Sequence, residues 1–99
     1  MPTVHVEPEA ANELERLRAT AETAADFQLL AVLSRARADT YSFQLAENLA
    51  EREHLRPAGK ERRAAARRQV LNESITWCRA MSARWNDLAE AYDRKAKEL

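Results

Sequence analysis

Three side chains near the middle of the chain have the types and spacing of a metal site. Glu47, Glu51 and His54 are separated by four and three residues, so all three fall on one face of a helix. Glu-x-x-His is also the pattern that presents a carboxylate and an imidazole to iron in di-iron helical bundles. Such a centre needs matching carboxylates on a facing helix, and the candidates there, Glu61 and Glu73, stand among arginines. We therefore predict a charged helix end, with no metal and no cofactor.

Cys78, the single cysteine, is the second residue with reactive chemistry. A nucleophilic cysteine needs a base and open, electropositive surroundings. The two histidines, His5 and His54, lie in the N-terminal tail and near the centre of the chain, away from Cys78 in the expected pairing of helices. Cysteine at an apolar position of a helical repeat packs as a small hydrophobic residue. Since no Ser/His/Asp set and no Gly-rich phosphate loop are present either, we predict that the chain is not an enzyme.

A basic segment spans residues 56–68, with six bases and one acid. Four of its arginines are candidate contacts to the phosphates of DNA or RNA: Arg62, Arg63, Arg67 and Arg68. No aromatic residues alternate with these bases, and no helix-turn-helix pattern accompanies them. The segment could instead lie antiparallel to Glu47, Glu51 and Glu53 and be partly neutralised there. We favour this second interpretation and keep nucleic-acid binding as the alternative function.

The composition of the 99 residues predicts an all-α fold. Glycine occurs once and proline three times, whereas alanine occurs 20 times and 32% of the residues are charged. Sheets need turns, which rely on Gly and Pro, while abundant alanine and charge are typical of long helices and coiled coils. The 16 basic and 16 acidic residues cancel, so no overall field draws the chain to nucleic acid or membrane. The charge is nevertheless segregated, at −4 in residues 1–50 and +4 in residues 51–99.

The segment Arg56-Pro57-Ala58-Gly59 is the one strong break in the helical pattern. Proline disfavours a helical residue before it, and glycine alone tolerates positive φ without cost. Residues 9–55 and 60–99 contain neither residue type, so we expect one helical domain over 1–99, with a tail at about 1–7 and a turn at about 56–59. Thr23 followed by Asp26 is a helix-start signal. An antiparallel helical hairpin and a three-helix bundle, with helices at about 8–22, 24–55 and 59–98, both remain open.

The C-terminal arm carries a coiled-coil-like repeat. Five residues recur every seven positions: Leu71, Cys78, Trp85, Tyr92 and Leu99. Ile75, Met81, Leu88 and Ala96 fill the intermediate positions and complete an apolar seam. A short turn brings this seam alongside the apolar stripe of residues 27–49.

Apolar side chains exceed what a pair of helices can bury. Trp77 flanks the seam, and a second apolar row on the first arm contains Leu29, Leu33 and Phe43. Exposed apolar patches mark interaction sites. The sequence therefore predicts a non-catalytic protein–protein interaction or assembly module that associates with itself, as a homodimer or larger, or with another protein.

The N-terminal segment lacks the basic and apolar regions of a signal peptide. The longest apolar run, residues 29–33, is far shorter than the roughly 20 residues that span a bilayer. One cysteine cannot form an internal disulfide. We expect a cytoplasmic chain that does not enter membranes, of bacterial or phage type in its Arg and Ala usage.

The length and two-arm outline are similar to those of small secreted helical hairpins with a Trp-x-Gly turn. Here the turn reads Arg-Pro-Ala-Gly, and Trp77 and Trp85 both lie inside the second arm. We therefore assign the chain to no family.

Overall fold

The computed structural model describes the backbone of residues 8–99 and the side chains from residue 12 onward. This part of the chain is all-α, as the composition predicts, and holds no strand. Its elements are α1 (Pro8–Thr20), α2 (Ala24–His54), the short 3-10 helix η1 (Arg56–Ala58) and α3 (Arg62–Glu98). The expected tail at about 1–7 lies outside the described residues.

The first arm breaks where Thr23 and Asp26 predict a helix start. The Thr23 hydroxyl accepts a hydrogen bond from the Asp26 N–H at 3.1 Å, and the Asp26 carboxylate accepts from the N–H groups of Glu22 and Thr23, both at 3.0 Å. This reciprocal capping box satisfies backbone donors that the first turn of a helix leaves without partners. The helix start is therefore confirmed, and the first arm is two helices rather than one.

The turn between the long helices is longer than expected. Pro57 lies in the first turn of η1, and Gly59 follows it at φ 56° and ψ −122°, a conformation that side-chain-bearing residues rarely adopt. The Glu61 N–H still donates to the Ala58 carbonyl at 3.2 Å. Consequently α3 begins at Arg62, not near residue 59.

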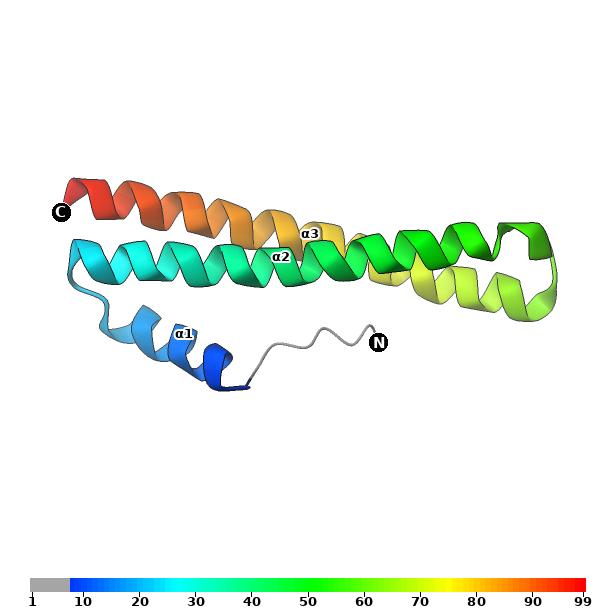
Figure 1. Ribbon diagram of the computed structural model, residues 1–99, viewed down its shortest axis with the longest axis horizontal. Coiled ribbons are helices and arrows are strands. Elements are labelled where there is room, and N and C mark those ends of the chain that lie inside the picture. The colour runs from blue at the N-terminus through cyan, green and yellow to red at the C-terminus, as the bar shows by residue number, and fades with distance from the viewer. Residues whose placement is uncertain (1–7) are drawn as a thin grey trace.

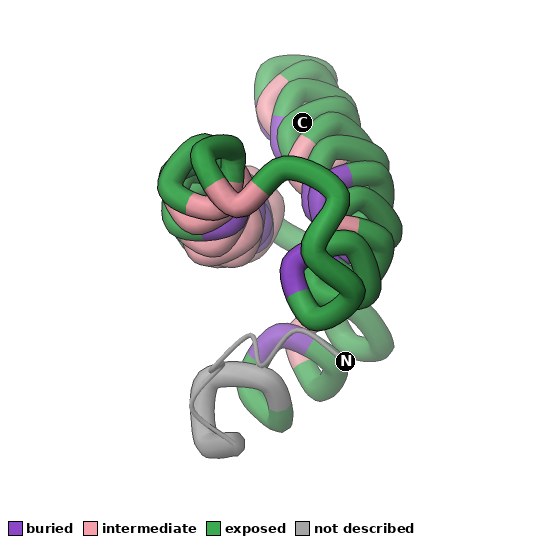
Figure 2. Tube along the Cα trace, turned by 90° about the vertical axis from the view of Figure 1, so that its right-hand side faces the viewer, coloured by how far each residue is buried: buried purple, intermediate pink, exposed green. Residues whose placement is uncertain are grey.

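Helices α2 and α3 lie antiparallel and side by side, joined by this turn (Figure 1). The predicted seam is buried at Leu71, Cys78 and Trp85, and small residues such as Ala38 and Ala89 let the two helices approach closely. In Figure 2 the buried parts of the two helices lie mainly on the sides that face each other.

The prediction is wrong for Leu99, which is 60% exposed. The Tyr92 ring meets Phe27, near the first residue of α2, with 6.3 Å between ring centroids. Leu99, seven residues beyond Tyr92, therefore lies past the end of α2 and faces no helix.

Helix α1 folds back along the half of the molecule that is far from the turn (Figure 1). Leu14 is buried in one cluster with Leu30, Ala38 and Trp85, and Leu17 packs against this cluster. The result is an elongated molecule of 57 × 23 × 14 Å. Its radius of gyration is 17.2 Å, against about 13 Å for a compact domain of this length.

Candidate interaction surfaces

The outer side of α2 carries a row of large apolar side chains. Leu29, Val32 and Phe43 are exposed, and Phe43 is 68% exposed. With 3.6 residues per turn, these positions fall opposite the side that packs on α3, where Leu30 and Ala38 are buried. Helix α2 therefore presents an apolar stripe to solvent, on the face away from its partner helix.

Leu33 departs from the predicted row. It is partly buried and packs against the cluster that contains Leu14 and Trp85. One residue along a helix corresponds to about 100° of rotation, which moves Leu33 from the face of Val32 toward that cluster. Leu33 is thus a core residue on the edge of the stripe.

A second apolar surface lies on α3. Trp77 is 50% exposed and Val70, seven residues before it on the same side, is 44% exposed. Met81 and Leu88 continue this side at helical spacing and are partly buried against the cluster that contains Leu14. Val70 and Trp77, which lie nearer the turn on the same side, stay exposed. We call Val70 and Trp77 the Trp77 patch.

The four arginines predicted as a group divide into two pairs. Arg67 makes a bidentate ion pair with Glu51, with Nε–Oε2 at 2.5 Å and Nη2–Oε1 at 2.9 Å. Arg68 donates to the carbonyl oxygens of Leu55, at 3.3 Å, and Gly59. Arg62 and Arg63 are exposed and form no hydrogen bond or ion pair within the described residues.

Two of the three acids of α2 that were expected to neutralise the basic segment 56–68 form ion pairs with its arginines. The hydrogen bond from Arg67 lowers the pKa of the Glu51 carboxyl below its ordinary value. Glu53 pairs with Arg56 at 3.2 Å. Glu47 is exposed and makes no ion pair with any described residue.

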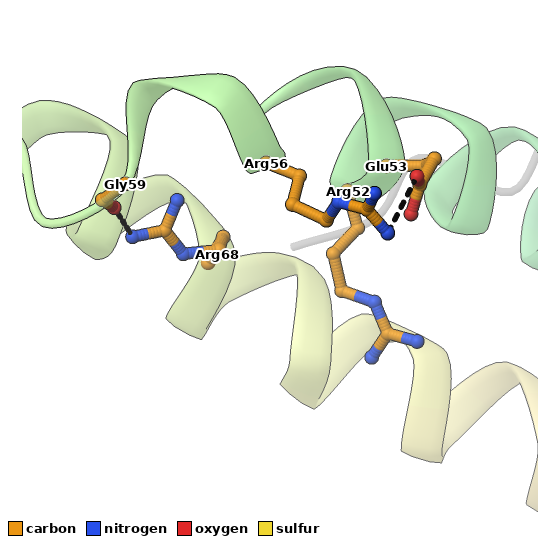
Figure 3. A pocket seen from close by; sticks show the side chains of 5 residues that line it. All are labelled: Arg52, Glu53, Arg56, Gly59 and Arg68. Atoms are coloured by element: carbon orange, nitrogen blue, oxygen red, sulfur yellow. Dashed lines mark hydrogen bonds and ion pairs between the residues drawn. The ribbon is translucent and has the colours of Figure 1, made fainter.

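A small open hollow, which sequence patterns do not indicate, lies beside the turn (Figure 3). Its volume is about 260 Å³, and it is lined by Arg52, Glu53, Arg56, Gly59 and Arg68. Arg52 stands outside the basic segment 56–68, one helical turn before Arg56, and donates to the Asn72 side chain at 2.8 Å. Only the fold brings Arg52 and Arg68, sixteen residues apart, to one site.

Two of the residues considered for metal binding and catalysis, Glu51 and Cys78, are engaged in other ways. Glu51 is committed to Arg67, and no group of three His, Cys, Asp or Glu side chains in the described residues is placed to hold a metal ion. Cys78 is completely buried in the seam.

Comparisons with protein-family models, with curated proteins and with solved structures gave no match. Among the described helices, none combines the length and the apolar character needed to cross a membrane.

Proposed function

We propose that this chain is a non-catalytic protein–protein interaction module that self-associates through the apolar side chains left on its long helices. The observation that carries the proposal is the Trp77 patch, an indole and a valine exposed on one side of α3. Tryptophan is among the residues most enriched in the energetic centres of protein interfaces.

The energetic gain from covering this patch is substantial for a small protein. Complete burial of an aromatic side chain removes about 150–250 Å² from water. Covering the exposed half of Trp77 is then worth about 2–3 kcal/mol per copy, at roughly 25 cal/mol per Å². In a two-fold symmetric dimer, each contact between different residues occurs twice.

The remaining structure suits an assembly role. We infer that the three helices act as one unit, in which α1 completes the core at one end and the α2–α3 pair presents the Trp77 patch and the stripe of Leu29, Val32 and Phe43. A second copy laid antiparallel along α3 is the simplest occupant. It would bring the basic turn of one copy, with six bases and one acid in residues 56–68, near residues 13–26 of the other, which hold four acids and two bases.

Light scattering after gel filtration tests this proposal at micromolar concentration. We expect the wild type to be at least dimeric and Trp77→Ser to shift the equilibrium toward monomer, since the substitution removes the central apolar contact. Leu99→Ser is the matched control, because Leu99 is also exposed but lies at the end of α3. A monomeric wild type, or equal effects of the two substitutions, would contradict the proposal.

Nucleic-acid binding through residues 56–68 stays the alternative. Arg62 and Arg63 support it, since both are exposed, whereas Arg67 and Arg68 already bond within the chain. Two available arginines are few for a surface that binds the phosphate backbone of nucleic acid, because the affinity for nucleic acid grows with the number of phosphates neutralised. Titration with duplex DNA tests this alternative: we expect only weak binding near physiological salt, and tight, salt-sensitive binding that is lost in Arg62→Gln and Arg63→Gln would favour it.

A further inference from the structure

We propose that the hollow at the turn is a binding site for a small phosphate-type oxyanion, held by Arg52, Arg56 and Arg68. This site is separate from the apolar surfaces and does not depend on self-association. The three arginines come from α2, η1 and α3 and line one open hollow, with Arg56 turned toward Glu53 and Arg68 toward Gly59 (Figure 3).

Each arginine has a partner within the chain and keeps donors to spare. Arg52 donates to Asn72 at 2.8 Å, Arg56 pairs with Glu53 at 3.2 Å, and Arg68 donates to the carbonyls of Leu55 and Gly59. A guanidinium has five N–H donors, so these bonds leave several for a ligand. Donors that are already oriented lose less conformational entropy when they bind an anion.

The charge of the lining fits a dianion. Three arginines and one glutamate give the hollow a formal charge of +2. Glu53 is the only acid in the lining. The nearby Glu51 lies outside the lining and is paired with Arg67. Arginine forks bind phosphate oxygens with charge-assisted, often bidentate hydrogen bonds. A phosphate or phosphate monoester carries −1.5 to −2 near neutral pH and would balance the lining.

The size of the hollow favours a single anionic group. Its volume of about 260 Å³ lies below the roughly 300–1,000 Å³ of pockets for drug-sized ligands. A nucleic-acid strand would need a row of available basic side chains on the protein to follow the phosphates of its backbone. The ion pair of Arg67 with Glu51 interrupts such a row. The geometry therefore points to one oxyanion rather than to a polyanion.

Titration with inorganic phosphate, followed by NMR of backbone amides and arginine Nε–Hε groups, tests the site. Ionic strength is held constant with chloride. We expect saturable shifts at Gly59, Arg52, Arg56 and Arg68. Arg56→Gln should weaken phosphate binding by about tenfold, because it removes one charge-assisted contact. Arg79→Gln is the control, an exposed arginine of α3 outside the hollow.

A second variant, Arg68→Gln, and titrations with chloride and with duplex DNA separate the possible outcomes. Arg68→Gln should also weaken binding, but Arg68 bonds to the turn, so its helical circular dichroism is checked first. The Arg56 side chain pairs only with the exposed Glu53 among described residues, so its variant keeps the test valid if Arg68→Gln unfolds. Equal shifts with chloride, equal loss in Arg79→Gln, or tighter binding of duplex DNA that depends on Arg62 and Arg63 would overturn the proposal.

Discussion

Trp77 and Trp85, eight residues apart on α3, show how strongly the position of one residue decides its role. Trp85 is 6% exposed in the cluster with Leu14 and Leu30, and the Arg37 guanidinium lies 4.6 Å from the centroid of its ring. The indole therefore gains both apolar burial and a cation–π contact. Its Nε1–H, however, has no hydrogen-bond partner among the described residues. Trp85 contributes through packing rather than through a polar contact.

Substitution of the two tryptophans should separate folding from association. We expect Trp85→Ala to lower the free energy of unfolding by about 3–5 kcal/mol, because a cavity replaces a large buried side chain. Trp77→Ala should lower monomer stability clearly less than Trp85→Ala does, because half of the Trp77 side chain is already exposed. Urea unfolding at low protein concentration measures both values. Similar losses for the two variants would show that the assignment of the seam is wrong.

At the scale of elements, helix ends are fixed by local chemistry that a sequence displays. Thr23 and Asp26 mark the start of α2, and Gly59 marks the turn, because a cap and a positive φ each require particular residue types. The same reasoning placed α2 and α3 to within a few residues. The capping box also makes one helix start sensitive to acid.

Stability should fall in acid through two carboxyl groups. Hydrogen bonds from the backbone N–H groups of Glu22 and Thr23 lower the pKa of Asp26, and the hydrogen bond from Arg67 lowers that of Glu51. Unfolded Asp and Glu titrate at about 3.9 and 4.3. The stability that depends on the ionised forms is therefore complete above these values and is lost as pH falls through the folded-state pKa.

Thermal unfolding followed by circular dichroism between neutral pH and pH 3 checks this prediction. The midpoint should fall as the pH drops below about 4, and it should fall less in Asp26→Asn and Glu51→Gln than in the wild type. Glu73→Gln serves as the control, since Glu73 is exposed and makes no ion pair with any described residue. An identical pH dependence in all four proteins would show that neither carboxyl matters.

Features that depend on the relative position of two helices could not be predicted from the sequence. Asn48 and Ser74 are polar, yet both are buried and share a hydrogen bond between α2 and α3. An apolar pattern marks Asn48 and Ser74 as surface positions, and only the register of the two helices makes them partners. The same register selects Arg67, rather than Arg62 or Arg63, as the partner of Glu51. It also brings Arg52 to the hollow.

At the scale of the whole molecule, the core is uneven along its length of 57 Å. Near the turn, the buried residues lie between two helices only, whereas α1 adds a third element at the opposite end (Figure 1). Helix α1 has only 13 residues, and isolated helices shorter than about 12–15 residues are marginal in water. Its helical state therefore depends on the docking of Leu14 and Leu17.

Hydrogen exchange should reveal this dependence. We expect amides of α1 to exchange faster than those near Leu71 and Cys78 in α3, because α1 can detach by local unfolding. Leu14→Ala should accelerate exchange in α1 more than at Leu71. Glu13→Ala, an exposed neighbour of Leu14, is the control. Uniform exchange across the helices, or equal acceleration at both places, would show that α1 is not a separate unit.

The single turn between α2 and α3 also implies an order of folding events. Contacts between the two helices close larger loops with increasing distance from the turn: 16 residues for Glu51–Arg67, 26 for Asn48–Ser74, 40 for Ser42–Ser82 and 58 for Arg35–Asp93. Closing the loop of 58 residues directly costs about 1 kcal/mol more than closing the loop of 16. We infer that pairing begins at the turn and proceeds outward, so that each contact shortens the loop left for the next. Since Leu14 docks where α2 and α3 meet last, α1 joins the core at the end of folding and leaves it at the start of unfolding, which is the detachment that the exchange experiment measures.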